Sequence, residues 1–373
     1  MSPPHFNRYH ASILRAREVG LALAGVQEEA LLALLAEFTE ELVRLVRAGI
    51  ATDAETALAG EVQRLFAALA VDAQTRVRQG VRLTAERCAT IHAQATADLI
   101  RAVRPVGADG IAGRLAFSMR AVNVEAAQAV LSRPEFSEAF VSIADADAAG
   151  ANRVLHRGLL RGAPTAAIER ELRMYVGAPG SLVGGDEEML SDLRRISYGT
   201  LEELGYVEPT YQDLLQVRRD AGAVRNRVQL IARTEVMGAQ HEAHVRSVEA
   251  SPVVAAVRVS LSYSHPVPDQ CDTAAHANLY SLGPGLYPPG KVPARFHPRC
   301  LCKFTDVLLP VDEWGAERPP PPPLSVDWDE LRKAYALTPS QVSSLEASIS
   351  IGEARWAGSK RKPVADSLPR PHL

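Results

Sequence analysis

The residues best suited to chemistry gather in one stretch of the C-terminal third, where three of the chain's four cysteines stand beside two histidines. The stretch begins with Cys271-x4-His276, continues through a loop rich in glycine and proline, and ends with His297-x2-Cys300-x-Cys302. Thiolate and imidazole groups are the ligands that hold zinc in tetrahedral sites, which usually combine two short ligand pairs joined by a loop. Bound metal would also fix a segment that has too few apolar residues to fold alone. We therefore expect a metal site here, with zinc as the metal.

Five candidate ligands compete for the four positions of a tetrahedral site. Cys300 and Cys302 are the firmest of them, because thiolates bind zinc most tightly. Cys271, His276 and His297 would supply the rest, and one of these three could instead hydrogen-bond to a ligand without binding the metal itself. A structural zinc is the favoured interpretation. A loop of unliganded cysteines and a catalytic zinc with an open water position are the alternatives.

The sequence lacks the familiar motifs of zinc catalysis. A zinc deaminase needs His-x-Glu paired with Cys-x-x-Cys, which this spacing does not match. The segment His241-Glu-Ala-His244 differs from the His-Glu-x-x-His helix of metalloproteases, because its histidines are only three residues apart. We interpret it as a solvated helix face. No serine, histidine and acid motif for nucleophilic catalysis stands out either, so we do not expect an enzyme.

The composition is that of a folded, mainly helical protein. Apolar residues make up 47% of the 373 positions and charged residues 23%, while aromatic residues are only 5%. The chain is long enough for two or three domains, and its richness in alanine and leucine favours helices over sheets. The net charge of −3 indicates neither a nucleic-acid nor a membrane partner.

Membrane insertion and secretion are not expected. No stretch approaches the roughly 20 uninterrupted apolar residues of a membrane span, and the N-terminal residues lack the apolar segment of a secretory signal. Cys88 stands alone in a helical pattern, and we interpret it as a small buried residue. One lone cysteine beside a clustered trio argues against a disulfide framework and for a reducing compartment.

Two long antiparallel helices are predicted over residues 10–105, and we expect them to form a bundle core rather than a coiled-coil dimer face. Gly49 would end the first helix, and Thr52-Asp-Ala-Glu55 reads as a capping box that opens the second. Each helix carries an apolar stripe at spacings of three and four residues. The stripe residues are Leu31, Leu35, Phe38, Leu42 and Leu45 in the first helix and Val77, Val81, Thr84, Cys88 and Ile91 in the second.

The rest of the chain divides into further helices, a short β-containing stretch and a tail. Val257, Val259, Leu261 and Tyr263 alternate with polar residues, which is the signal of a half-buried strand. The remaining predicted elements are helices at about residues 111–132, 139–160, 165–175, 188–204, 210–249 and 328–350 and a closing strand at 303–309. The predicted fold class is therefore mainly α, a long helical bundle with a small C-terminal α+β module stabilised by zinc.

These patterns divide the chain into five contiguous segments. Five consecutive prolines mark a stiff linker between the last two folded parts. The predicted segments are an N-terminal helical bundle at 1–135, a second helical part at 136–250, the metal-binding module at 251–312, the proline-rich linker at 313–327, and a helical and basic tail at 328–373.

Three pieces of the sequence, taken together, resemble one protein family. The pieces are Ile231-Ala-Arg233-Thr-Glu235, then Asp269, Cys271 and His276 after the predicted strand, and last Pro293-x3-His297-Pro-Arg-Cys300-Leu-Cys302. They are similar to the Ala-Arg-Thr-Glu helix, the Asp-…-Cys/His segment and the Pro-Pro-x-His-Pro-Asn-Cys-Arg-Cys ending of the minor head proteins of tailed phages, also called Mu F-like or phage head morphogenesis proteins. The turn Gly158-Leu-Leu-Arg-Gly162 before a helix also fits. The family's Arg between the two cysteines is Leu301 here, so any contact made by that Arg is missing or replaced.

The resemblance covers roughly residues 150–310 and implies a low-copy virion component near the portal. Such a protein would act in head assembly and in genome packaging or delivery, with the portal protein and the major capsid protein as partners. It would lie in the virion head, and in the host cytoplasm during assembly, with no membrane partner. Arg233, Glu235 and Asp269 would serve as structural tethers. Because Arg233 and Glu235 lie on different faces of a helix, we expect at least one of them to reach the zinc-bearing module.

Residues 215–250 are locally basic and leave a second class of function open. The arginines are Arg218, Arg219, Arg225, Arg227, Arg233 and Arg246. Such a helix could face the phosphates of double-stranded DNA, although a solvated helix of mixed charge is the favoured interpretation. A zinc-containing DNA-binding protein and a zinc hydrolase are therefore the two alternatives to the phage-head interpretation.

Overall fold

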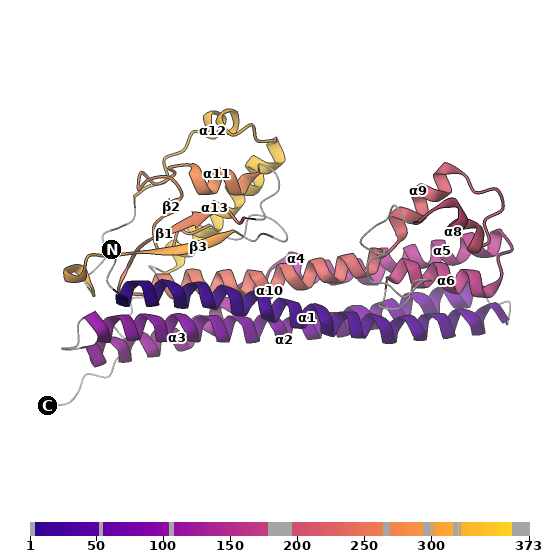
Figure 1. The fold of residues 1–373 in the computed structure, drawn as a ribbon, viewed down its shortest axis with the longest axis horizontal. Helices are drawn as coiled ribbons and strands as arrows, with labels where there is room; N and C mark the ends of the chain where they lie inside the picture. Colours follow the sequence, from indigo (N-terminus) through magenta and orange to yellow (C-terminus); the bar gives the residue numbers. More distant parts are fainter. Residues whose placement is uncertain are drawn as a thin grey trace. The chain divides into compact units, whose positions relative to one another are not determined.

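The computed structural model describes residues 4–51, 55–103, 108–177, 196–263, 269–293, 300, 302–315, 320 and 322–359. The described chain is mainly helical and has one three-stranded antiparallel sheet, formed from residues in its C-terminal part (Figure 1). The predicted fold class, mainly α with a small α+β module, is confirmed. The capping box at Thr52–Glu55 falls mostly outside the described residues.

The chain forms two compact units, each made of separate stretches. Unit 1 consists of residues 1–21, 82–130 and 237–373, and unit 2 of residues 22–81 and 131–236. The predicted segments are contiguous, whereas three of the four boundaries between the units fall well inside helices: α1 (Pro4–Ala51), α2 (Glu55–Val103) and α10 (Ala223–Ala250). The fourth falls at the last residue of α3 (Ala108–Leu131). A sequence reading that ends each domain at a loop does not find such boundaries.

Unit 2 is built on the apolar stripe predicted for the first long helix. In this unit Leu31, Leu35, Phe38 and Leu42 of α1 are buried. Phe38 meets Phe66 of α2 edge to face, with ring centroids 4.7 Å apart. Burial of such a stripe removes about 25 cal/mol for each Å² of apolar surface taken from water. The predicted bundle core is therefore present along these residues.

Shorter helices complete unit 2. They are α4 (Pro134–Ser142), a π-helix (Ile143–Asp147), α5 (Ala148–Leu160), α6 (Thr165–Val176), α8 (Tyr198–Glu203), α9 (Tyr211–Asp220) and the first part of α10. The helix predicted over 139–160 is thus interrupted by a π-helical turn. The helix predicted over 210–249 is broken at Gly222, whose φ of 67° is left-handed and whose N–H donates to the carbonyl of Met174 at 2.8 Å.

A buried acid ties these short helices together. Glu171 of α6 is 2% exposed and accepts hydrogen bonds from Arg157 of α5, from Arg161 at 2.8 Å and from the hydroxyl of Tyr206 at 3.0 Å. The guanidinium of Arg161 also stacks on the Tyr206 ring, 3.6 Å from its centroid. Arg161 belongs to the Gly158–Gly162 turn, so this turn is fixed to α6 by charge as well as by chain connectivity.

Unit 1 contains the sheet. Strands β1 (Val254–Ser260), β2 (Leu286–Tyr287) and β3 (Lys303–Leu308) are ordered β2-β1-β3, and both pairings are antiparallel. In Figure 1 the C-terminal part of α10 runs along one side of the strands, and α11 (Gln270–His276) and α13 (Pro339–Ser359) lie on the other. Helix α12 (Trp328–Ala334) precedes α13.

The predicted strand alternation holds over only part of its length. Val257 and Val259 are buried, as the pattern requires. The strand ends at Ser260, however, and Tyr263 is fully exposed with the ammonium of Lys303 4.6 Å from its ring centroid. The alternation of apolar and polar residues in the sequence therefore extends beyond the last residue that pairs in the sheet.

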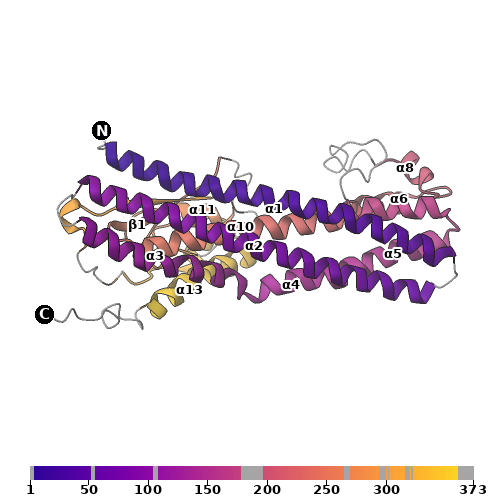
Figure 2. The ribbon, with the colours of Figure 1, turned by 90° about the horizontal axis from the view of Figure 1, so that it is seen from below.

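Three further helical stretches belong to unit 1. The N-terminal residues of α1 run alongside the C-terminal residues of α2, and α3 (Ala108–Leu131) lies next to α2 (Figure 2). The thiol of Cys88 on α2 lies 3.3 Å from the carbonyl oxygen of Ala16 on α1. Cys88 is fully buried, which confirms its interpretation as a small core residue.

One helix among the described residues, α1, is long and apolar enough by length and composition to cross a membrane. It contains an 18-residue window of mean hydropathy 1.6, of which 28% is buried. A core helix of a soluble protein passes the same test. The absence of a membrane partner stays a prediction.

Candidate functional site

Three thiols from two distant pieces of sequence converge inside unit 1. The sulfur atoms of Cys271, Cys300 and Cys302 all lie within 4.8 Å of one another, and all three residues are buried. The Sγ atoms of Cys271 and Cys300 are 3.7 Å apart, too far for a disulfide bond. We call these three residues the thiol cluster. It could hold a metal ion, because three sulfur ligands at this spacing can surround one cation.

Helix α11 presents Cys271 through a capping box. Asp269 is its N-cap residue, and its Oδ1 atom accepts a hydrogen bond of 2.6 Å from the backbone N–H of Cys271. The carboxylate of Asp272 accepts from the backbone N–H of Asp269 at 2.8 Å. Asp269, predicted to be a tether, therefore fixes the backbone that carries the first thiol.

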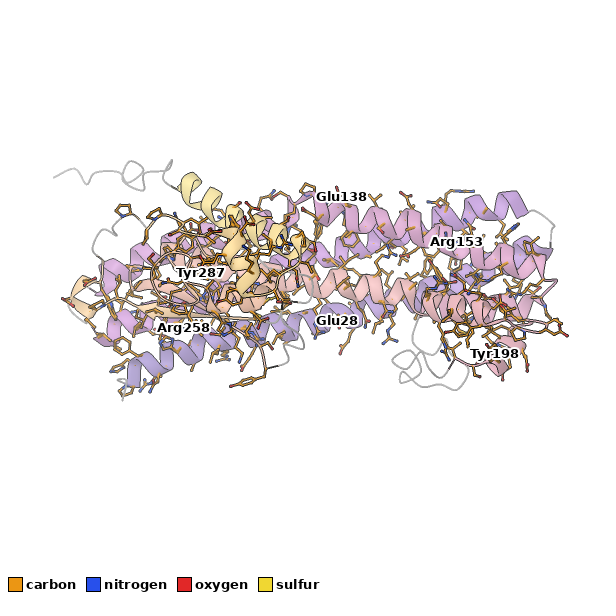
Figure 3. The ribbon with its side chains drawn as sticks, turned by 90° about the horizontal axis from the view of Figure 1, so that it is seen from above. Glu28, Glu138, Arg153, Tyr198, Arg258 and Tyr287 are labelled. Atoms are coloured by element: carbon orange, nitrogen blue, oxygen red, sulfur yellow. The ribbon has the colours of Figure 1, made fainter. Side chains whose placement is uncertain are left out.

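The end of α11 is fastened to the sheet by two contacts. The hydroxyl of Tyr287 donates to the carbonyl of Ala274 at 2.9 Å. The N–H of Gly285 donates to the carbonyl of Ala277 at 3.0 Å, while its own carbonyl accepts from Val259 of β1 at 2.9 Å. Figure 3 labels Tyr287 on β2 and Arg258 on β1, where these strands pair. Cys302 comes directly before β3, so the same sheet positions both halves of the cluster.

Gly285 can make its contacts only because it lacks a side chain. Its φ of 66° is left-handed, and an added Cβ would lie 2.3 Å from the carbonyl oxygen of Ala275. The chain after α11 thus passes the helix at a distance that no other residue permits.

The electrostatics of the cluster favour a bound cation. Hydrogen bonding to Cys300 and Cys302, together with burial, raises the pKa of the Cys271 thiol far above its ordinary value. Thiolates packed this closely repel one another and have lost their water, so negative charge accumulates here only with a compensating positive charge. A divalent metal would supply that charge and would displace the thiol protons on binding.

The two predicted histidine ligands have different outcomes. His276 is exposed at the end of α11, its Nδ1 atom lies 2.8 Å from the carbonyl oxygen of Asp272, and the group that could hold a metal does not include it. His297 lies outside the described residues. Within the described chain, the ligand set brought together is therefore Cys271, Cys300 and Cys302.

The Arg-Thr-Glu segment lies in unit 2, on α10. Arg233 is half exposed, and its Nε atom lies 3.6 Å from a carboxylate oxygen of Glu28 on α1, which Figure 3 labels. Glu235 is 5% exposed. The contact of Arg233 is thus with a neighbouring helix, and the predicted tether from this segment to the metal-binding module stays a prediction.

The interpretation of His241 and His244 as a solvated helix face is wrong. The two residues are 5% and 1% exposed, because the C-terminal part of α10 is covered by β3 and by α2 within unit 1. The His241 ring stacks on Phe304 with centroids 4.8 Å apart. The His244 ring meets His92 of α2 edge to face at 4.7 Å.

These contacts belong to a buried polar network of four residues, Tyr9, His92, His244 and Asp306. The Tyr9 hydroxyl donates to Oδ2 of Asp306 at 2.6 Å, and Nε2 of His244 lies 2.9 Å from Oδ1. Burial alone would raise the pKa of Asp306, but the nearby His244 and the Tyr9 hydrogen bond lower it overall. Burial, with the neighbouring His244, lowers the pKa of His92 to about 3.

The network joins four elements: α1, α2, α10 and β3. It is closed to solvent, so it holds the elements in register rather than meeting a substrate. Each member looks ordinary in its own stretch of sequence. The one signal that could have found it is the pair of histidines three residues apart on a helix that is apolar on several sides.

The expected solvated, mixed-charge helix at residues 215–250 is also wrong for most of its length, because α10 is largely buried. Two of its arginines pair with acids of their own units. Arg227 lies 3.2 Å from Asp147 of the π-helix, and Arg246 lies 2.9 Å from Glu125 of α3. Arginines committed to such pairs are less available to DNA phosphates.

The chain was compared with known proteins. It matches no model of a protein family, and no curated protein or solved structure is significantly similar to it.

Proposed function

We propose that this chain is a minor head protein of a tailed phage or prophage, a low-copy structural component near the portal that acts in head assembly and in genome packaging or delivery. The observation that carries the proposal is the convergence of the thiol cluster. Cys271 comes from the Asp-…-Cys/His piece of the resemblance, and Cys300 and Cys302 come from its ending. Two motifs that are separate in the sequence thus contribute thiols to the same cluster, as expected if both belong to the metal site of that family.

We propose zinc as the metal and a structural role for it. Buried thiolates favour zinc over the hard cations, which prefer oxygen ligands. His297 is the proposed fourth ligand, because a three-residue step from Cys300 spans at most about 10 Å. His276 is the second candidate for that position. Zinc would lock a module whose sheet has one strand of only two residues and a correspondingly small core.

Each part of the chain would have its own role in this function. The long helices would present extended faces to portal and major capsid subunits. The thiol cluster would hold the small β-containing module rigid. The basic C-terminal tail would contact double-stranded DNA or a neighbouring subunit.

The test is co-expression of the chain with the portal protein encoded beside it. Size-exclusion chromatography with light scattering gives the composition of the complex, and metal analysis of the same peak gives the zinc content. A stable complex with about one zinc per chain is the expected result. The Cys302→Ser variant should lose the zinc, whereas Cys88→Ser, which changes the thiol outside the cluster, should keep both zinc and complex.

A zinc-loaded chain with no affinity for the portal protein would contradict the proposal. A zinc-containing DNA-binding protein or a zinc hydrolase would then be the favoured function. A titration with double-stranded DNA at several salt concentrations separates these two, because phosphate contacts weaken steeply as salt rises.

A further inference from the structure

An open cleft on unit 1 has the chemistry of a protein-docking groove. It encloses about 490 Å³ between the N-terminal residues of α1 and the C-terminal residues of α2. Its floor includes Ala95 and Leu99, which are buried aliphatic residues of α2. Its α1 side carries Arg8, Ser12 and Arg15. We call this cleft the basic groove.

The charge of the groove is positive. Arg8 and Arg15 are exposed, and within the described part of the chain neither has an ion-pair partner. The acid on the opposite side, Asp98, already accepts from Gln94 at 2.8 Å and from Arg101 at 3.2 Å. The negative charge of Asp98 is therefore balanced on its own helix, and the two arginines of α1 face the cleft uncompensated.

The spacing of the two arginines indicates which kind of partner fits the groove. Arg8 and Arg15 are seven residues apart, so they stand on one face of α1 about 10 Å apart along its axis. A partner helix lying along the groove would match them with acids that are also seven residues apart. Two exposed alanines in the lining, Ala11 and Ala102, let such a helix approach closely with an apolar stripe. Single-stranded nucleic acid fits less well, because it needs exposed aromatic faces for base stacking. Of the two rings in the lining, Tyr9 is 3% exposed and His5 has only a small imidazole ring.

We propose that the basic groove binds an amphipathic helix of a partner protein, which carries an apolar stripe flanked by acidic residues. The mode is a helix laid into a groove, with its apolar face supplying affinity and the flanking acids supplying register and specificity. The proposal concerns a surface remote in sequence from the thiol cluster and does not depend on the phage-head role. It names the partner's chemistry, which the proposed function leaves open.

The test uses the full chain and two synthetic helical peptides of about 18 residues. Both peptides carry leucine and alanine on one face, and they differ only in having glutamate or lysine on the flanks at seven-residue spacing. Binding is followed by fluorescence anisotropy. The glutamate peptide should bind the unaltered chain, and the lysine peptide should bind at least about tenfold more weakly.

Charge reversal then locates the site. The double variant R8E/R15E should lose at least about tenfold in affinity for the glutamate peptide and should gain affinity for the lysine peptide. The matched control is R82E/R87E, which reverses two other exposed arginines of unit 1 on α2 and should bind as the unaltered chain does. Circular dichroism confirms that each variant is folded.

Three results would overturn the proposal. The first is that the glutamate peptide does not bind the unaltered chain. The second is that R8E/R15E binds the two peptides as the unaltered chain does. The third is that a single-stranded oligonucleotide binds in place of the acidic peptide and is lost in R8E/R15E, which would assign the groove to nucleic acid instead.

Discussion

The Nε2 atom of His244 lies 2.9 Å from Oδ1 of Asp306, and both side chains are at most 2% exposed. Neither atom has a hydrogen bond of normal geometry, so the contact is a close approach of two polar atoms without an aligned N–H···O bond. The other oxygen of Asp306 accepts from Tyr9. Asp306 thus lies between α1 and the buried face of α10, and each of these helices contributes a side chain that contacts its carboxylate.

Replacing Asp306 with asparagine should destabilise unit 1 by about 3 kcal/mol, since it disturbs the contacts of a buried carboxylate with Tyr9 and His244 and leaves buried polar groups without a partner. Urea unfolding followed by circular dichroism measures the change. The matched control is Asp312→Asn, which alters an exposed acid just after β3 and should change the free energy of unfolding by less than about 0.5 kcal/mol. Equal effects of the two substitutions would show that the pair contributes nothing.

Stability should fall as the pH drops from about 6.5 towards 3. The pKa of His92 is lowered from 6.5 to about 3 in the folded chain, so the unfolded chain takes up a proton in this range and the folded chain does not. The resulting slope is at most about 1.4 kcal/mol per pH unit. Asp306, whose pKa is also lowered, begins to lose its contribution once the pH falls below the ordinary carboxyl value of 3.8.

The His92→Gln variant checks this pH dependence. Its stability should change less between pH 7 and pH 4 than that of the unaltered chain, in urea titrations at each pH. His156→Gln changes an exposed histidine and should leave the slope as it is. An unchanged slope in His92→Gln would contradict the assignment to His92.

Removing metal should loosen the module around α11 and the sheet. With zinc bound, Cys271→Ser, Cys300→Ser and Cys302→Ser should each reduce the metal from about one per chain to a small fraction, because each removes one thiolate. A chelator should have the same effect on the unaltered chain and should increase amide exchange at β1 and β3. Cys88→Ser is the control, since its Sγ contacts the Ala16 carbonyl outside the cluster and a serine hydroxyl can reach the same oxygen.

Gly285→Ala should cost at least about 2 kcal/mol. Its Cβ would lie 2.3 Å from the carbonyl oxygen of Ala275, so α11 would be pushed from the sheet together with Cys271. Gly162→Ala is a matched control, because Gly162 has a nearly equal φ of 64° but an added Cβ meets nothing within 4 Å. It should cost only the backbone strain, about 1 kcal/mol. Comparable losses for the two variants in thermal unfolding would show that the close approach is relieved easily.

Glu171→Gln should destabilise unit 2 by about 3 kcal/mol, since it removes the charge that Arg157 and Arg161 share inside the unit. Glu169→Gln lies on the same helix and breaks an ion pair with the exposed Arg47. Such surface pairs contribute little to stability. Denaturant unfolding of both variants separates the buried pair from the surface pair, and a larger loss for Glu169→Gln would contradict this ranking.

The thiol cluster could be predicted because its ligands are recognisable by residue type and local spacing. Cys271 stands in a local capping box, and Cys300 and Cys302 stand just before a strand, so each half carries its own signal. The long apolar stripes were equally readable, because helix periodicity is a local property.

The buried polar network could not be predicted, since no local pattern joins residues 9, 92, 244 and 306. The burial of His241 and His244 has no local signal, since the polar residues Gln240 and Glu242 stand beside them in the sequence and all four are buried by other elements. The break at Gly222 had a readable signal, a glycine after Asp220 and Ala221. The π-helical turn at Ile143–Asp147 had none, because a π-helix has no distinctive composition.

The hydrogen bond between Tyr9 and Asp306 joins residues 297 positions apart. A ribosome that adds about 5–20 residues per second needs roughly 15–60 s to make the intervening chain. During that time the first turns of α1 are outside the ribosome while β3 does not yet exist. The first turns of α1 must therefore wait for one of the last strands to be synthesised before Tyr9 can pair with Asp306. Stalled or truncated products ending before Asp306 should be the forms of this protein most prone to aggregation and proteolysis.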